Sequence, residues 1–157
     1  PEPMILPVAS RVMSLRDGLK KMSKSDSSEM TRIELLDNND LIAKKISKAK
    51  TDPFPMPKQV SDLESRPEVS NLINIYSAFS KEEVVAVINK FEGKPLSEFK
   101  KELGDIVVNQ IEPIREEFIK LKKERKYITD ILEKGRIKAK KKSDPILNQI
   151  KSIVGLG

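Results

Sequence analysis

Residues 97–121 read SEFKKELGDIVVNQIEPIREEFIKL, and this run carries the clearest structural signal in the sequence. Its apolar residues recur at intervals of three and four, the spacing that places side chains on one face of an α-helix. They are Phe99, Leu103, Ile106, Val107, Ile111, Ile114, Phe118 and Leu121. The spacing predicts one long amphipathic helix with Ser97 as its N-cap. A kink is expected at Pro113, because proline removes a backbone hydrogen bond.

Two shorter helices are predicted on the N-terminal side of this run. Pro67 suits the first position of a helix, and the apolar residues after it recur at helical spacing. Ser80 and Glu83 have the spacing of a capping box, so the second helix is expected to begin at Ser80. Gly93 is expected to end it.

The C-terminal side of the run is also predicted to be helical. One helix leads into the basic run 138–142, and Pro145 is expected to begin the last helix. The apolar residues of that last helix are expected to face inward; they are Leu147, Ile150, Ile153 and Val154. Because helices joined by short loops pack antiparallel, the sequence predicts an all-α fold, a bundle of four or five helices.

The chain before Pro67 is predicted to hold smaller elements. Residues 38–49 fit a short amphipathic helix capped by Asn38 or Asn39. Four prolines make residues 51–67 an extended linker or loop. Residues 1–30 are expected to be rich in loops.

Several short features are expected within that first part. The breakers of regular structure are Pro1, Pro3, Pro7 and Gly18. Val12–Leu15 fits a short strand, and Asp17 with Gly18 fits a turn. Asp26 is expected to begin a helical turn, with Glu29 three residues later.

The composition excludes several classes of site. The chain has 157 residues, of which 34% are charged and 38% hydrophobic, as in a soluble helix-rich domain. It has no cysteine and no histidine, so disulfides, cysteine or histidine metal sites and a Ser-His-Asp triad are excluded within it. We expect a reducing cytoplasm, no membrane span and a start at Pro1 that reflects a cut inside a longer protein.

The positive charge is concentrated near the C-terminus. Residues 120–142 hold eleven basic residues against three acidic ones, a local excess of +8 within a net charge of +6. This excess predicts a partner with a negative backbone, such as RNA, and the alternative is a solvated helical face. The candidate contacts are Lys122, Lys123, Lys126, Tyr127, Arg136 and Lys140. Tyr127 is the aromatic residue best placed to stack on a base, whereas the other aromatics fit core positions.

Residues 21–25 read Lys-Met-Ser-Lys-Ser and are the strongest functional signal. Two lysines stand three positions apart, and serine hydroxyls at positions 23 and 25 flank the second of them. Ammonium and hydroxyl groups on one short loop suit a polyanion such as a triphosphate. The alternative is a solvated loop without a ligand.

The same five residues, in the same order, form the second signature loop of the class I aminoacyl-tRNA synthetases. The flanking residues resemble the tryptophanyl members of that class, and so do segments 70–77, 91–94 and 112–115. The first signature of the class needs two histidines, which this chain lacks. Leu19 departs from the family, whose members often have threonine there.

The resemblance implies activation of L-tryptophan with ATP and its transfer to tRNA(Trp). Lys21 and Lys24 would be catalytic and hold the triphosphate and the departing pyrophosphate. The implied ATP-binding residues are Val12, Lys21, Met22, Ser23, Lys24 and Ser25. Magnesium would be held by phosphates and water, with no metal ligand from the chain and no tightly bound cofactor.

The resemblance also implies two parts. Residues 1–30 would end an α/β catalytic domain, and residues 31–157 would form a helical tRNA- and anticodon-binding domain. A homodimer would form through the N-terminal half of the enzyme, and this chain alone is expected to be inactive. The alternatives are a helical RNA-binding module without catalysis and the related tyrosyl-tRNA synthetase.

Overall fold

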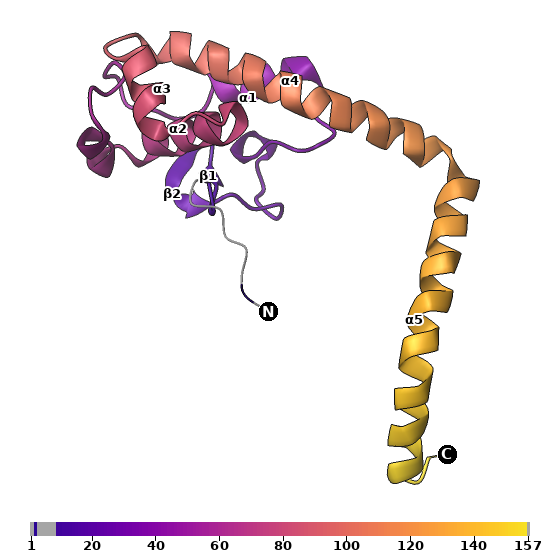
Figure 1. Ribbon diagram of the computed structural model, residues 1–157. Helices are drawn as coiled ribbons and strands as arrows, with labels where there is room; N and C mark the ends of the chain where they lie inside the picture. Colours follow the sequence, from indigo (N-terminus) through magenta and orange to yellow (C-terminus); the bar gives the residue numbers. More distant parts are fainter. Residues whose placement is uncertain (1, 3–8, 157) are drawn as a thin grey trace. The chain divides into compact units, whose positions relative to one another are not determined.

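The computed structural model describes residue 2 and residues 9–156, so the breakers expected at Pro1, Pro3 and Pro7 lie outside the described residues. The described part is mostly helical, as predicted, and includes one two-stranded antiparallel hairpin. In chain order the elements are β1 (Met13–Ser14), β2 (Asp17–Lys21), the 3-10 helix η1 (Glu29–Thr31), α1 (Asn39–Ser47), the 3-10 helix η2 (Val60–Ser65), α2 (Pro67–Ser80), α3 (Val84–Phe91), α4 (Leu96–Lys123) and α5 (Arg125–Ile153) (Figure 1).

The chain divides into two compact units, residues 1–115 and residues 116–157. The division falls inside α4, so each unit contains part of that helix. The boundary expected between residues 30 and 31 separates two functional parts, not two compact units, and it stays a prediction.

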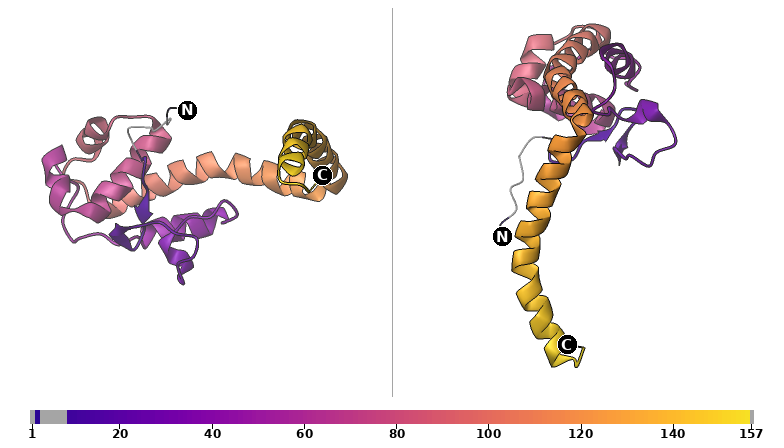
Figure 2. Two further views of the ribbon diagram at one scale, coloured as in Figure 1. Left: turned by 90° about the horizontal axis from the view of Figure 1, so that it is seen from below. Right: turned by 90° about the vertical axis from the view of Figure 1, so that its right-hand side faces the viewer.

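The core of the first unit contains a cluster of three aromatic rings, each from a different helix. Tyr76 of α2, Phe91 of α3 and Phe99 of α4 are each at most 1% exposed. Their ring centroids lie 5.1–5.6 Å apart, and Phe91 meets the other two edge-on, the arrangement that the ring quadrupoles favour. Both views in Figure 2 show α2, α3 and the first part of α4 gathered in one body.

The helix boundaries confirm some predictions and correct others. The side chain of Asn38 caps α1 by accepting a hydrogen bond from the Leu41 N–H at 2.8 Å. Pro67 begins α2 as predicted. Ser80 is the last residue of α2 instead of the cap of the next helix. Lys81 then takes the left-handed conformation at φ +62°, which turns the chain and moves the start of α3 to Val84.

Two prolines lie inside helices, one where a kink was predicted and one where a new helix was predicted to begin. α4 begins at Leu96, so Ser97 lies in its first turn, and the helix continues through Pro113. α5 continues through Pro145, which therefore does not begin a new helix. Proline removes one hydrogen bond, but the strong helix formers on both sides of Pro145, including the lysine run before it, keep the flanking turns helical.

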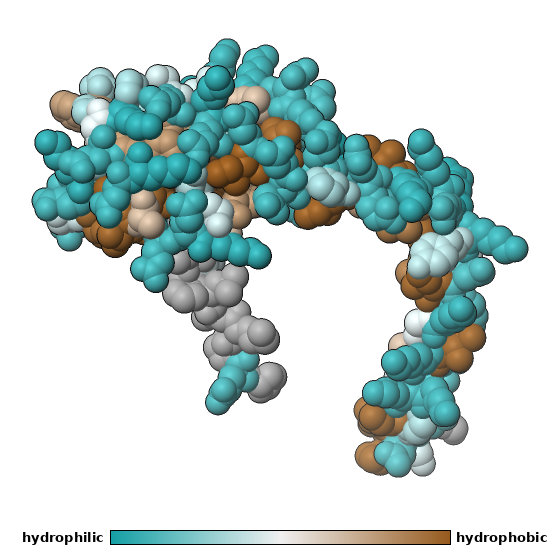
Figure 3. Space-filling model, turned by 45° about the horizontal axis from the view of Figure 1, so that its top comes forward, coloured by the Kyte–Doolittle hydropathy of each residue, from teal (hydrophilic) through white to brown (hydrophobic). Residues whose placement is uncertain are grey.

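α5 buries none of its residues, which contradicts the inward orientation expected for its apolar side chains. Ile150 is 51% exposed and Ile153 83%. The periodicity identified an amphipathic face correctly, but periodicity does not specify a partner for that face. Figure 3 shows apolar side chains interspersed with hydrophilic ones along this helix.

Smaller elements were also placed differently from the predictions. The turn of the hairpin is at Leu15 and Arg16, because β2 already begins at Asp17. The helical turn expected at Asp26 begins at Glu29. The segment expected to be an extended linker contains η2. Among the described helices, none is long and apolar enough to cross a membrane.

Candidate functional site

The hairpin β1–β2 positions the segment 21–25, hereafter the lysine loop. Met13 pairs with Lys21 across the hairpin, and the Met22 N–H donates to the Val12 carbonyl at 3.1 Å. Val12 and Met22 are both half-buried against the core. The loop therefore begins from a fixed strand, and the backbones of two predicted ATP-binding residues are directly joined.

Asn71 of α2 holds the other strand of the hairpin. Its Oδ1 accepts from the Met13 N–H at 2.9 Å, and its Nδ2 donates to the Met13 carbonyl at 3.0 Å. An amide that satisfies both backbone groups of one residue fixes that residue in position and orientation. Asn71 was not predicted as a site residue, although it belongs to the segment 70–77 that carried the family resemblance.

Gly18 lets β2 approach the start of α2. A β-carbon at this position would lie 2.5 Å from the Glu68 nitrogen and 2.5 Å from the Pro67 carbonyl carbon. No residue with a side chain fits there without moving the helix backbone. Sequence reasoning assigned Gly18 to a turn, because a close approach of two segments leaves no local signal.

The lysine loop itself is exposed and partly self-bonded. The hydroxyl oxygens of Ser23 and Ser25 lie 3.0 Å apart, and the Ser25 N–H donates to the Ser23 hydroxyl at 3.3 Å. Lys21 and Lys24 are both exposed, and within the described part of the chain neither forms an ion pair. These two ammonium groups are thus available to an anion.

Lys20 and Asp26, which flank the pentapeptide, form an ion pair at 3.1 Å. The Asp26 carboxylate also accepts from the Ser28 N–H at 3.1 Å. That backbone hydrogen bond and the Lys20 ammonium lower the pKa of Asp26. The carboxylate therefore stays ionised at neutral pH, and it neutralises the lysine before the loop while leaving the two loop lysines unpaired.

The basic candidates near the C-terminus lie in the second unit and do not form one cluster. Lys123, Lys126 and Tyr127 line one hollow of about 590 Å³ where α4 gives way to α5. Tyr127 is 51% exposed, so its ring is accessible as predicted. Lys122 is exposed but is not part of the lining.

The other two basic candidates are farther along α5 and already have partners. Arg136 donates two hydrogen bonds to Glu133, at 2.7 and 2.6 Å. Lys140 forms an ion pair with Asp144 at 3.2 Å. Their positive charge is partly neutralised, whereas in the described part of the chain Lys123 and Lys126 form no ion pair, although Glu124 and Asp130 line the same hollow.

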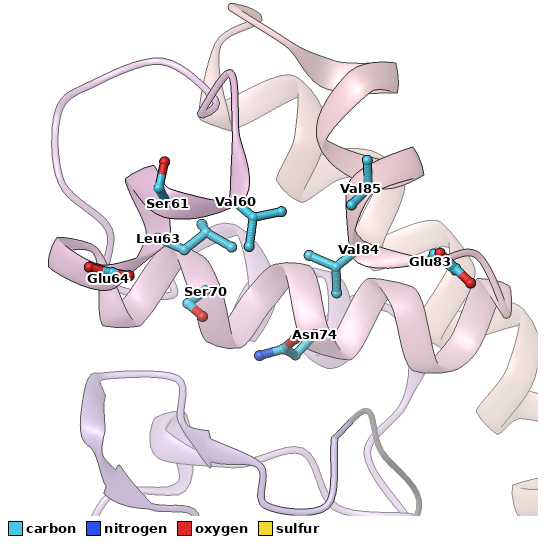
Figure 4. Close-up of a pocket in the computed structure, with 9 residues that line it drawn as sticks. All are labelled: Val60, Ser61, Leu63, Glu64, Ser70, Asn74, Glu83, Val84 and Val85. Carbon is cyan, nitrogen blue, oxygen red and sulfur yellow. The ribbon is translucent and has the colours of Figure 1, made fainter.

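A second hollow, of about 850 Å³, lies between η2, α2 and α3 (Figure 4). None of the predicted site residues lines it. Its lining has four apolar residues, three uncharged polar residues, two glutamates and no basic residue: Val60, Ser61, Leu63, Glu64, Ser70, Asn74, Glu83, Val84 and Val85. Its acidic residues make it unsuited to a polyphosphate.

The sequence matches a protein family described as tRNA synthetases class I (W and Y) over residues 1–110. A tryptophan–tRNA ligase from Rickettsia felis is 43% identical over 155 residues, which cover 99% of this chain and 46% of that relative. A tryptophan–tRNA ligase from Rhizobium meliloti is 45% identical over 157 residues, covering 98% and 44%. The chain spans about half the length of the curated relatives it matches.

A solved structure is similar as well. The tryptophanyl-tRNA synthetase from Mycoplasma pneumoniae superimposes with a TM-score of 0.69 and 28% sequence identity. The match covers 94% of this chain and 46% of that one.

Proposed function

We propose, because this chain belongs to the class I tRNA synthetase family of the tryptophan and tyrosine enzymes, that it is the phosphate-binding and tRNA-binding part of a tryptophan–tRNA ligase. The observation that carries the proposal is that Lys21 and Lys24 form no ion pair within the described residues and lie on a loop that a packed hairpin holds. The similarity to tryptophan ligases favours tryptophan over tyrosine as the substrate.

The proposed reaction produces negative charge close to the lysine loop. The tryptophan carboxylate attacks the α-phosphate of ATP, the bond to the β-phosphate breaks, and pyrophosphate leaves. Catalysis of such a step depends on positioning and on neutralising the charge of the leaving group. Lys21 and Lys24 would supply the positive charge that neutralises the pyrophosphate. Ser23 and Ser25 would exchange their mutual hydrogen bond for bonds to phosphate oxygens.

The backbone of Val12 would meet the adenine, as the family resemblance implies. Its carbonyl already accepts from the Met22 N–H, so a shift of Met22 would also move the Val12 backbone where adenine binds. Met22 is half-buried and would act as the hinge on which the loop opens and closes. This backbone link supports a coupling between nucleotide binding and loop closure.

Magnesium would enter with the nucleotide. Among the described residues no group of three acidic side chains is placed to hold a metal ion. As the family resemblance implies, phosphate oxygens and water would coordinate the ion, since Mg²⁺ keeps much of its water in proteins. When bound, it would share with the two lysines the neutralisation of the phosphates.

The second unit would contact tRNA(Trp) through Lys123, Lys126 and Tyr127. Lysines supply affinity for the phosphate backbone, and an exposed aromatic ring can stack on an unpaired base. We also propose a cytoplasmic enzyme that forms a homodimer through parts of the protein outside this chain.

Lys24→Ala in the full-length enzyme tests the catalytic part of the proposal. We expect tryptophan-dependent exchange of pyrophosphate into ATP to fall by at least about 100-fold, because loss of one charge-stabilising group typically has that effect. Tryptophan binding should change much less. Lys44→Ala, in an exposed position on α1, is the matched control and should leave exchange unchanged. An unchanged exchange rate in Lys24→Ala would contradict the role.

A further inference from the structure

We propose that Arg32 is a positioning residue for the lysine loop. Its guanidinium group holds the backbone that leaves the loop and so determines where Lys21 and Lys24 stand. This inference rests on the proposed function, because it concerns the placement of the same two ammonium groups.

The contacts of Arg32 point in two directions. Its Nη1 donates to the carbonyl oxygens of Asp26, at 3.1 Å, and of Ser28, at 3.3 Å. Its Nε donates to the Glu34 carboxylate at 2.7 Å. The Arg32 side chain is only 15% exposed, and its bond to the Asp26 carbonyl is partly buried, whereas the bonds to Ser28 and Glu34 lie at the surface. The guanidinium therefore connects the exit of the loop to the segment that leads into α1.

The backbone on which Arg32 stands is itself fixed to the hairpin. The carbonyl of Thr31, the preceding residue, accepts from the Leu15 N–H at 2.9 Å, and Leu15 is buried in the core. The Thr31 hydroxyl donates to the Ser28 carbonyl at 2.7 Å. On the other side, the Glu34 N–H donates to the Asp37 carboxylate at 2.9 Å. Arg32 thus transmits the rigidity of the core to the loop.

The two ends of the loop are held unequally without Arg32. The entry is fixed by the strand pairing and by the bond between Met22 and Val12. Across the exit, Asp26 is tied to Lys20, whose side chain is 62% exposed. Exposed ion pairs contribute little because water competes with them, so the exit depends on the bond from the Thr31 hydroxyl to Ser28 and on the guanidinium, which also reaches the Asp26 carbonyl.

Charge and geometry make different predictions for this residue. If Arg32 acted only by its positive charge, lysine would replace it. A lysine ammonium group carries its three N–H donors on one nitrogen atom, and it does not reproduce a planar fork whose Nη1 and Nε bond to acceptors on different segments. Arg32→Lys should therefore behave like Arg32→Gln.

The test uses the 157-residue chain and inorganic pyrophosphate. The dissociation constant is measured by titration for the parent chain and for Arg32→Gln, Arg32→Lys and Arg66→Gln. Backbone amide exchange of residues 22–28 is followed by NMR in each. Arg66 is the matched control, because it donates to the Asp52 carboxylate at 2.7 Å and has no contact with the loop.

We expect both Arg32 variants to bind pyrophosphate about tenfold more weakly, a change of about 1.4 kcal/mol at 25 °C. Their loop amides should exchange faster, while amides of α2 and α3 keep the parent rates. Arg66→Gln should leave the loop and the affinity unchanged.

Several outcomes would overturn the inference. If Arg32→Lys bound pyrophosphate as tightly as the parent chain, Arg32 would act only through its positive charge. If the loop amides exchanged at the parent rates in both variants, Arg32 would have no positioning role. Faster exchange without weaker binding would separate loop order from phosphate affinity and would also reject the inference. A parent chain that binds no pyrophosphate would instead reject the proposed function. Binding that is lost in Lys24→Ala but kept in both Arg32 variants would reject the inference alone.

Discussion

The ammonium group of Lys45 lies 2.5 Å from a carboxylate oxygen of Asp37, and the two side chains are 0% and 8% exposed. Asp37 lies just before α1, and its carbonyl accepts from Arg115 of α4 at 2.7 Å. Asp37 thus connects the segment after the lysine loop to α1 through its carboxylate and to α4 through its carbonyl.

Lys45→Met should destabilise the chain strongly. The substitution leaves the Asp37 carboxylate buried without its counter-charge, which typically costs about 3–5 kcal/mol. Urea unfolding followed by circular dichroism measures the free energy. Lys44→Met is the control, since Lys44 is exposed on the same helix and its loss should change the free energy by less than about 0.5 kcal/mol. Equal effects of the two variants would contradict the importance of the buried pair.

Gly18→Ala should separate the hairpin from α2. The added methyl group would lie 2.5 Å from the backbone at Pro67 and Glu68, so a shift is required that should cost about 1–3 kcal/mol. Gly135→Ala is the matched control, because no atom lies within 4 Å of a β-carbon at Gly135 inside α5. That variant should keep or raise the helix content. A stable Gly18→Ala chain with unchanged amide shifts in α2 would refute the close approach.

The pKa of Glu102 should respond to loss of the Tyr76 hydroxyl. Burial alone would raise the pKa of Glu102, but hydrogen bonds from Lys90, at 2.5 Å, and from Tyr76, at 2.6 Å, outweigh burial and lower it. A carboxyl group with a lowered pKa in the folded state stabilises the fold above its unfolded pKa. That stabilisation is lost as the pH falls through the folded pKa.

Tyr76→Phe keeps the packed ring and removes one of those bonds. The pKa of Glu102 should therefore rise toward its ordinary value, and acid destabilisation should begin at a higher pH than in the parent chain. A carboxyl ¹³C titration by NMR measures the first effect, and urea unfolding across pH 3–6 measures the second. Tyr127→Phe, on an exposed ring of the second unit, should reproduce the parent curve. An unchanged Glu102 titration in Tyr76→Phe would refute the coupling.

Binding of tRNA should depend on the unpaired lysines more than on the paired basic residues. Lys123→Ala and Lys126→Ala should each reduce the slope of log affinity against log salt concentration by about 1, the value for one phosphate contact. Arg136→Ala should have a smaller effect, because Glu133 already neutralises much of its charge. The measurement is a filter-binding titration with tRNA(Trp) at several salt concentrations. A slope that no variant changes would place the tRNA contacts elsewhere.

Local patterns in the sequence were enough to predict the helical class, a cap of α1 at Asn38 or Asn39, the start of α2 at Pro67 and a loop that contains the two lysines. Each of these depends on residues within one or two turns, where spacing and capping chemistry act directly. Ser80 and Pro145 were misassigned because a local rule permits a cap or a helix start at such residues without requiring one.

Contacts between distant segments could not be read from the sequence. The clamp of Asn71 on Met13 joins residues 58 positions apart, and the bond from Arg115 to Asp37 joins residues 78 positions apart. Gly18 and Arg32 have local sequences that do not indicate their contacts. The chemistry proposed for the lysine loop is therefore read from five consecutive residues, whereas the position of the loop arises from packing. A hydrogen bond or a close approach depends on three-dimensional distance and leaves no periodic trace along the chain.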